Sequence, residues 1–175
     1  MKYRAEIDGL RTIAIISVLI YHAEFLLSGR NILPGGFFGV DVFFVISGYL
    51  VPTIILNELE KNGKFSFANF YERRARRLLP ALILVIVFFI PLAYFYLLPE
   101  QLTDFSSSII SSLGFVSNFY WNSTLQGYEV EDALLKPFLH TWSLAVEEQY
   151  YIIIPILLLF IHNITTANSK QQTAK

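Results

Sequence analysis

Long apolar stretches separated by short charged segments dominate the hydrophobic pattern of this chain. A membrane-spanning helix needs about 20 mostly apolar residues to cross a hydrocarbon layer of roughly 30 Å. Four stretches have this character, and they run from about Leu10 to Leu27, Phe37 to Leu56, Leu78 to Leu98 and Leu139 to Ile161. We therefore expect an all-α fold, a polytopic transmembrane helix bundle.

A fifth stretch, Ser106 to Trp121, is short and rich in serine. It fits a span, a re-entrant segment or an interfacial helix, so the pattern predicts four or five spans. We place Pro80 in the first turn of the third span, where its missing N–H costs nothing. The polar segment 163–175 predicts a loop or a disordered end. Residues 1–161 are thus expected to form the membrane domain, and 162–175 a polar loop or tail.

Composition supports a bilayer and excludes several classes of function. Hydrophobic residues make up 54% of the 175 residues and charged residues 15%, and the mean hydropathy is +0.51. The net charge of −1 gives no basic field for nucleic acid, so we expect no nucleic-acid partner. The chain has no cysteine, which excludes disulfides and thiolate metal sites within it. We expect no metal site and no bound cofactor.

Basic residues are distributed unevenly between the predicted spans, which indicates an orientation. Cytoplasmic loops carry an excess of lysine and arginine. The segment before the first span and the loop between the second and third are basic, whereas the loop at 28–36 holds only Arg30. The N-terminus and the arginine-rich loop are therefore predicted to be cytoplasmic.

Arg11 and His22 stand on the first predicted span, where a charged group is costly and needs a reason. Eleven residues at about 100° each bring both side chains to one face, roughly 16 Å apart along the axis. In one interpretation, Arg11 sets the orientation of the span and pairs with Asp8, and His22 lies at the outer interface. The other makes His22 a general base or an acyl carrier, because imidazole titrates near neutral pH.

Asp41 is an acid among aromatic residues in the second predicted span. Small residues at helical spacing, Gly39, Ser47 and Gly48, accompany it. The segment fits close helix packing with a hydrated Asp41 near the interface. It also fits an Asp41 that orients an active-site cation or His22.

Four arginines, Arg73, Arg74, Arg76 and Arg77, precede the third predicted span. Spacings of three and four place Arg73, Arg76 and Arg77 on one helical face. Such a cluster anchors a helix at the membrane surface or contacts anionic lipid. Guanidinium groups also bind phosphates, so a nucleotide-bearing donor such as acyl-CoA is the alternative.

The last predicted span opens with HTWSLAVEEQYY, which contains His140, Glu147 and Glu148. His140 and Glu147 are seven residues apart and share a face, while Glu148 lies about 100° further round. Thr141 or Ser143 could cap the helix. Two adjacent acids before a long apolar run nevertheless favour a functional role.

Four segments together resemble the bacterial acyltransferase family 3, whose members O-acetylate O-antigen, peptidoglycan, Nod factors and other glycans. The segments are YRAEIDGLRTIAIISVLIYH, GGFFGVDVFFVISGYL, FYERRARRLLPAL and LHTWSLAVEEQYY, in this order over residues 3 to 161. The resemblance implies that Arg11 and His22 are the family's Arg-x10-His pair, with His22 the catalytic base. It implies that Arg73 and Arg76, or Arg74 and Arg77, form the RxxR element that handles acyl-CoA.

By the same resemblance, Glu147 or Glu148 corresponds to the acid of the family's SLxVEEQFY motif, with Tyr150 in place of the family's Phe. The family's membrane domain has about ten helices, so the four or five spans here are expected to be a partial domain, completed by further helices or by an oligomer. Glu147, Glu148 and Asp41 are expected to serve His22, and Arg11 to steady the donor or the developing oxyanion.

The function expected from the resemblance is transfer of an acyl group, most simply acetyl, from cytoplasmic acyl-CoA to a hydroxyl of a cell-surface carbohydrate. The acceptor classes are O-antigen or other lipopolysaccharide, peptidoglycan and exopolysaccharide, and the location is the bacterial inner membrane. Two alternatives remain open at this point. One is a proton-coupled transporter that uses His22, Glu147 and Asp41 as a relay, and the other is an inactive membrane fragment.

Overall fold

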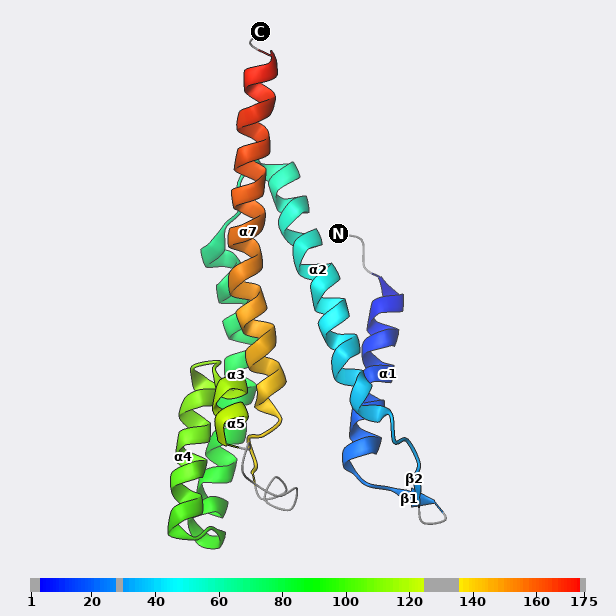
Figure 1. Ribbon diagram of the computed structural model, residues 1–175, viewed down its shortest axis with the longest axis vertical. Helices are drawn as coiled ribbons and strands as arrows, with labels where there is room; N and C mark the ends of the chain where they lie inside the picture. The colour runs from blue at the N-terminus through cyan, green and yellow to red at the C-terminus, as the bar shows by residue number, and fades with distance from the viewer. Residues whose placement is uncertain (1–3, 28–29, 125–135, 174–175) are drawn as a thin grey trace. The chain divides into compact units, whose positions relative to one another are not determined.

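The computed structural model describes residues 4–27, 30–124 and 136–173, and these residues are mostly helical (Figure 1). The helices are α1 (Ala5–His22), the short 3₁₀ helix η1 (Gly36–Phe38), α2 (Gly39–Asn62), α3 (Phe67–Tyr96), α4 (Pro99–Leu113), α5 (Ser117–Thr124) and α7 (Thr141–Thr173). A small antiparallel hairpin of β1 (Leu26–Leu27) and β2 (Arg30–Asn31) follows α1. The all-α prediction is confirmed.

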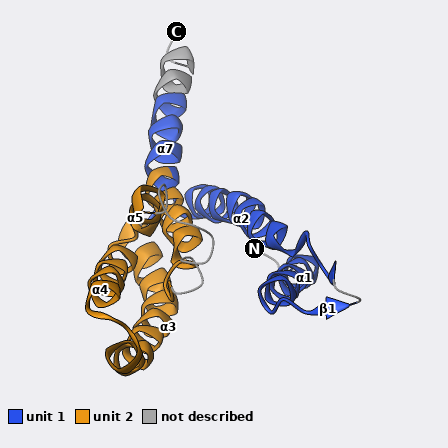
Figure 2. Ribbon diagram, turned by 60° about the horizontal axis from the view of Figure 1, so that its bottom comes forward, with its two compact units in different colours: residues 1–65, 154–175 blue, residues 66–153 orange. Residues whose placement is uncertain are grey.

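The chain divides into two compact units (Figure 2). The first unit contains residues 1–65 and 154–175, and the second contains residues 66–153. Within the first unit α1 packs against η1 and the start of α2. Each unit holds part of the predicted site, so each is described by itself.

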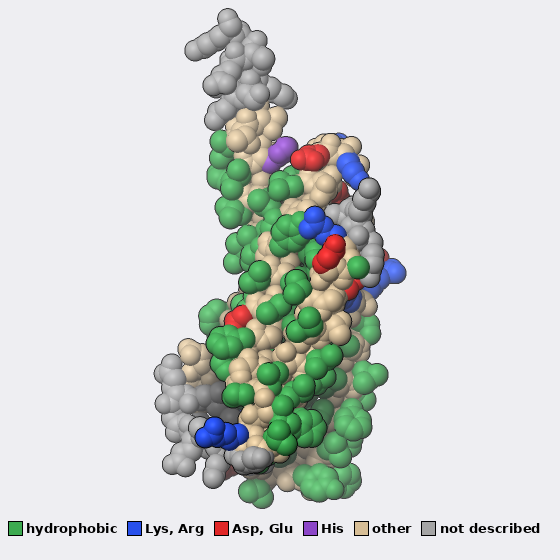
Figure 3. Space-filling model, turned by 90° about the vertical axis from the view of Figure 1, so that its right-hand side faces the viewer, with side chains coloured by type: hydrophobic (Ala, Val, Ile, Leu, Met, Phe, Trp, Pro, Cys, Tyr) green, Lys and Arg blue, Asp and Glu red, His purple; other side chains and the backbone are tan. Residues whose placement is uncertain are grey.

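Three helices within the described residues are long and apolar enough to cross a membrane, namely Gly36–Asn62, Phe67–Tyr96 and Thr141–Thr166. Their apolar side chains are widely exposed, with Val45 72% and Phe95 78% accessible. Figure 3 shows hydrophobic side chains over much of one face of the molecule. Such a surface suits lipid better than water, and the chain is a multi-pass membrane protein.

The first predicted span differs from the structure. Helix α1 includes the charged residues Glu6, Asp8 and Arg11 within its 18 residues, and it is not among the three apolar helices. It ends at His22 and not at Leu27, because the chain turns at Ala23 and Glu24, where Glu24 has a positive φ of 49°. Leu26 and Leu27 then enter the hairpin.

Helix α3 begins eleven residues before the predicted start of the third span. The backbone N–H of Asn69 donates to Ser66 Oγ, 3.4 Å away, which caps the helix. Pro80 therefore lies inside the helix and not in its first turn. A proline is tolerated there because neighbouring groups in a bundle can satisfy the freed carbonyl. The arginine-rich segment is helical as a consequence, and each arginine has a definite direction.

The serine-rich stretch from Ser106 to Trp121 is not one continuous span. Helix α4 ends at Leu113 and α5 begins at Ser117, with Phe115 between them at a φ of +52°. The 15 residues of α4 rise about 22 Å, less than the roughly 30 Å of a hydrocarbon core. Neither helix is among the three that are long and apolar enough to cross a membrane, and whether the stretch crosses stays a prediction.

Helix α7 continues to Thr173, whereas the sequence predicts a loop or a disordered end over 163–175. Threonine hydroxyls bond back to carbonyls one turn earlier, as Thr165 does to Ile161 and Thr166 to His162, both at 2.8 Å. These bonds satisfy polar side chains without ending the helix. The division into domains at residue 162 stays a prediction.

A hydrophobic core holds the second unit together. Buried side chains from α3, α4, α5 and the segment before α7 meet in it, namely Leu82, Ile86, Ala93, Phe105, Trp121 and Phe138. The indole N–H of Trp121 donates to the carbonyl of Phe138 at 3.2 Å, and Lys136 pairs with Asp104 at 2.7 Å. The start of α7 is thereby fastened to α4 and α5.

Candidate functional site

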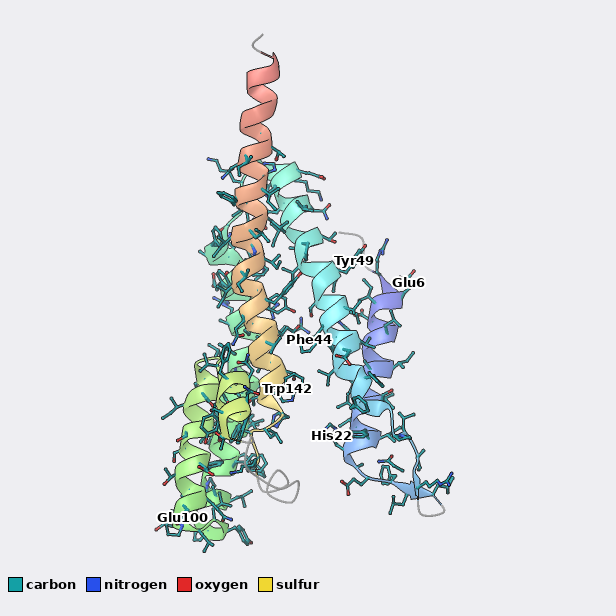
Figure 4. The ribbon with its side chains drawn as sticks, in the orientation of Figure 1. Glu6, His22, Phe44, Tyr49, Glu100 and Trp142 are labelled. Atoms are coloured by element: carbon teal, nitrogen blue, oxygen red, sulfur yellow. The ribbon has the colours of Figure 1, made fainter. Side chains whose placement is uncertain are left out.

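His22 is the last residue of α1 (Figure 4). Its imidazole makes a hydrogen bond to the backbone of the same helix. The Nδ1 atom lies 2.9 Å from the carbonyl oxygen of Val18, and the side chain is exposed. A carbonyl oxygen can only accept, so Nδ1 carries the proton in this contact. In the neutral ring Nε2 then has the lone pair, which is the atom that a general base requires.

Two glycines bring the start of α2 close to α1 near His22. A Cβ atom on Gly39 would lie 2.5 Å from the carbonyl oxygen of Ala14, and one on Gly36 would meet the carbonyl oxygen of Ser17. No real side chain fits at such distances, so the packing needs glycine at both positions. The rings of Tyr21 and Phe37 lie 5.6 Å apart, and the Tyr21 ring lies 5.2 Å from that of His22.

The other predicted site residues of the first unit occupy different environments. Asp41 lies in the first turn of α2 and is exposed, where the positive end of the helix dipole favours its negative charge. Arg11 is half-buried on α1, with its Nη1 atom 3.5 Å from Asp8. The pairing of Arg11 with Asp8, one of the two interpretations of this residue, is present in the structure, and its role toward the donor stays a prediction. The acceptor at Nδ1 of His22 is the Val18 carbonyl, so the helix itself holds that tautomer.

In the second unit, the four arginines of α3 divide between two faces. Arg73, Arg76 and Arg77 are exposed, and Arg76 makes a 2.7 Å ion pair with Glu72 on the same helix. Arg74 lies to one side of these three and is mostly buried, with 21% of its side chain exposed. The predicted shared face of Arg73, Arg76 and Arg77 is confirmed, and Arg74 is separate from it.

Arg74 pairs with Glu148 of α7, which is 8% exposed. Its Nη2 atom lies 2.6 Å from Glu148 Oε1 and its Nε atom 3.2 Å from the same oxygen. The guanidinium carbon lies 3.3 Å from the centre of the Tyr151 ring, which adds a cation–π contact. Breaking such a buried pair on one side costs about 3–5 kcal/mol, so the contact fixes α3 against α7.

Neighbouring residues of the EEQYY segment extend these contacts. The hydroxyl of Tyr151 donates to Glu147, and that of Tyr71 donates to the Tyr151 carbonyl at 3.2 Å. Gln149 donates to the carbonyl of Phe115 and to Asn118 Oδ1, both at 2.9 Å. The turn between α4 and α5 is thereby held on α7.

A mainly apolar pocket of about 190 Å³ lies beside the Arg74–Glu148 pair, lined by Tyr71, Arg74, Ala75, Leu78, Leu79, Phe115, Glu148 and Ile152.

Further along the unit, burial and the nearby Asp104 carboxylate raise the pKa of the Tyr120 hydroxyl. That hydroxyl donates to the Asp104 carbonyl at 3.2 Å.

Sequence reasoning missed the two tyrosines that complete this arrangement, Tyr71 and Tyr151. A signal for their placement exists in the helical spacing. Phe67, Phe70, Tyr71, Arg74 and Leu78 follow an i, i+3, i+4, i+7, i+11 stripe. Such a stripe marks the inward face of a helix, and it sets Arg74 apart from its three arginine neighbours.

Comparison with known proteins gives a consistent result. A family model described as an acyltransferase domain matches residues 4–169. Peptidoglycan O-acetyltransferase OatA of Listeria monocytogenes is 41% identical over 158 residues, which is 90% of this chain and 24% of that protein. O-acetyltransferase OatA of Staphylococcus aureus is 35% identical over 160 residues, which is 91% of this chain and 25% of that protein.

The chain thus spans about a quarter of the length of these curated relatives. No solved structure matches it.

Proposed function

Because this chain belongs to the acyltransferase family whose model matches residues 4–169, we propose that it acts in a membrane O-acetyltransferase. The donor is acyl-CoA, with acetyl-CoA the simplest, and the acceptor is a hydroxyl of a cell-envelope carbohydrate, with peptidoglycan the first choice. The relatives named O-acetyltransferases support the reaction class, and one of them is named for peptidoglycan. The location is the bacterial inner membrane with the N-terminus in the cytoplasm, in keeping with the positive-inside rule.

The observation that carries the proposal is the hydrogen bond between His22 Nδ1 and the Val18 carbonyl. It leaves Nε2 to take the proton of a sugar hydroxyl. The sugar oxygen then attacks the thioester carbonyl carbon and forms the new ester bond. The carbon–sulfur bond breaks, and the departing sulfur of CoA takes the proton from the imidazolium. In the alternative route His22 carries the acyl group before the sugar accepts it.

Charged residues of each unit have supporting roles in the proposal. Arg73, Arg76 and Arg77 present an exposed guanidinium face that suits the phosphates of CoA. Arg11, roughly 16 Å from His22 along the helix axis, steadies the donor. Asp41, in the first turn of α2, has the proposed role of orienting His22 or a cation of the site.

The test is an acyl-transfer assay with radiolabelled acetyl-CoA, cell-wall glycan and membranes that carry the protein. We expect label in the glycan with the unaltered protein and none with His22→Ala at an equal amount of protein. The matched control is His162→Ala, which removes an imidazole from α7 and should leave transfer unchanged. Undiminished transfer by His22→Ala would overturn the assignment of the base. Absence of transfer with the unaltered protein would overturn the proposed reaction.

A further inference from the structure

The acids of the EEQYY segment have two different environments, which matters because either could serve catalysis. Buried positions on this part of α7 are Thr141, Ala145, Glu148, Tyr151 and Pro155, a spacing of four, three, three and four that marks the inward stripe of a helix. Glu148 lies on this stripe, and Glu147 lies beside it. The inward acid is therefore the one whose surroundings decide its role.

The carboxylate of Glu148 is hydrogen-bonded to the guanidinium group of Arg74. Both carboxylate oxygens face the guanidinium, at 3.2 and 3.5 Å from Nε, and Oε1 also lies 2.6 Å from Nη2. A proton-transfer group has to exchange its proton with substrate. A carboxylate whose two oxygens both face an arginine fork is poorly suited to that exchange, because it would have to give up these hydrogen bonds to meet a substrate.

The guanidinium group of Arg74 is likewise occupied on two sides. Its edge pairs with Glu148, and its face lies on the Tyr151 ring, with the guanidinium carbon 3.3 Å from the ring centre. Binding a phosphate with this arginine would require both contacts to be given up. Counted in one sense around the helix, Arg73, Arg76 and Arg77 lie roughly 260°, 200° and 300° from Arg74, so the three share an arc of about 100°, and all three are exposed. Their face therefore remains open to a phosphate while Arg74 stays in its contacts.

We infer that Arg74, Glu148 and Tyr151 form a positioning cluster and that neither Glu148 nor Arg74 contacts the reacting atoms. The cluster locks α3 against α7, and Tyr71 adds a hydrogen bond to the Tyr151 carbonyl. By fixing the rotation of α3, it turns Arg73, Arg76 and Arg77 outward toward the donor phosphates. This inference rests on the proposed function for its link to acyl-CoA, whereas the lock between the helices stands without it.

The experiment compares four forms of the protein in membranes: unaltered, Glu148→Gln, Glu148→Ala, and the exchanged pair Arg74→Glu with Glu148→Arg. The kcat, the KM for acetyl-CoA and the pH profile of transfer are measured per amount of folded protein. A positioning role predicts that Glu148→Gln, whose amide oxygen still accepts from Arg74, keeps kcat within a few-fold and keeps the shape of the pH profile. Glu148→Ala should raise the KM for acetyl-CoA several-fold, and the exchanged pair should recover most of that loss.

A catalytic Glu148 predicts the opposite pattern. Loss of a general acid or base lowers kcat by about 10²–10⁴-fold, so Glu148→Gln would lose activity on that scale together with one limb of the pH profile. The exchanged pair would then stay inactive. That result would overturn the inference. Glu72→Gln is the matched control, since it removes an exposed carboxylate that pairs with Arg76 on the same helix and should leave kcat unchanged.

A second measurement keeps the test independent of the proposed reaction. Thermal unfolding of the purified protein in detergent gives a double-mutant cycle for Arg74→Ala and Glu148→Ala, each of which removes the contact between the two side chains. The lock predicts that the two substitutions together lower the melting temperature by clearly less than the sum of their separate effects. Simple additivity would overturn the lock, whatever the transfer assay shows. If the unaltered protein transfers no acetyl group but the cycle shows coupling, the proposed function fails and the lock stands.

Discussion

The Nδ1 atom of His22 lies 2.9 Å from the carbonyl oxygen of Val18, one helical turn earlier. Because the contact is local to α1, the tautomer of the imidazole is set by the helix that carries it. This relationship separates two properties of His22, its hydrogen bond to the backbone and its ability to take a proton, and different substitutions remove them.

Replacement of His22 by asparagine should abolish proton transfer with little effect on the fold. The asparagine amide can still donate to a nearby carbonyl, but it has no titratable nitrogen. We expect kcat to fall by about 10²–10⁴-fold while the KM for acetyl-CoA stays within a few-fold. Steady-state kinetics with labelled acetyl-CoA measure both constants. An unchanged kcat would show that Nε2 takes no part in the reaction.

Glycine-to-alanine substitutions at Gly39 and Gly9 should have opposite effects on stability. The new methyl group at Gly39 would lie 2.5 Å from the Ala14 carbonyl oxygen, whereas at Gly9 nothing lies within 4 Å. Gly39→Ala should lower the free energy of unfolding by about 1–3 kcal/mol through overpacking. Gly9→Ala should raise it by roughly 0.5–1 kcal/mol, because alanine favours the helix. Thermal unfolding in detergent measures both, and shifts of equal sign would contradict the close approach of α1 and α2.

Much of this fold could be predicted from the sequence, because long apolar runs leave few alternatives to helices. Helix ends were harder to predict, since they depend on local groups such as the Ser66 cap of α3 and the positive φ of Glu24 after α1. Where a helix continues through polar residues, as α7 does to Thr173, hydropathy marks the end of the apolar run and not the end of the helix.

For the candidate site, the sequence indicated which residues carry chemistry but not how they divide their roles. Arg74 has the same chemistry as Arg73 and Arg77, and only its place on the apolar stripe of α3 distinguishes it. Its partner Glu148 is 74 positions away, and pairing over that separation depends on tertiary packing, which helical periodicity alone does not give.

Substitution of Arg73 and Arg77 by glutamine should weaken donor binding without slowing the chemistry. Both lie on the exposed face of α3, and loss of a charge-assisted hydrogen bond to phosphate removes about 1.5–3 kcal/mol. The KM for acetyl-CoA should therefore rise by about tenfold or more for each, and its dependence on salt should weaken. Arg30→Gln on β2 serves as the control, with an unchanged KM expected. A KM unchanged in the double variant of Arg73 and Arg77 would exclude this face as the phosphate site.

Tyr120 should make the second unit sensitive to strongly alkaline solution. Burial, followed by the charge of Asp104, raises the pKa of its hydroxyl in the folded state. The stabilising contribution is thus fully present below the unfolded pKa of about 10 and is lost as the pH rises through the higher folded pKa. The free energy of unfolding is measured between pH 8 and pH 11.5, roughly one and a half to two units either side of that value. It should decrease less steeply with pH for Tyr120→Phe than for the unaltered protein. Tyr96→Phe, at a site that is 82% exposed, should keep the original slope, and equal slopes in all three proteins would contradict the prediction.

Phe138 should contribute more to stability than any lipid-facing aromatic residue of α3, because it is fully enclosed. Its side chain is 0% exposed, and its ring lies 5.6 Å from that of Phe105 and 6.2 Å from that of Phe89. Phe138→Ala should lower the free energy of unfolding by about 3–5 kcal/mol through the cavity that it leaves.

Phe95, which is 78% exposed, provides the matched comparison, since its replacement by alanine opens no internal cavity and should change the free energy of unfolding by less than about 0.5 kcal/mol. Guanidinium titration in detergent, monitored by circular dichroism, distinguishes the two variants. Because Phe138 lies three residues before the start of α7, the helix that carries Glu148, Phe138→Ala should also raise the KM for acetyl-CoA. If it destabilises the protein but leaves that KM unchanged, the core of the second unit and the orientation of the arginine face are independent of each other.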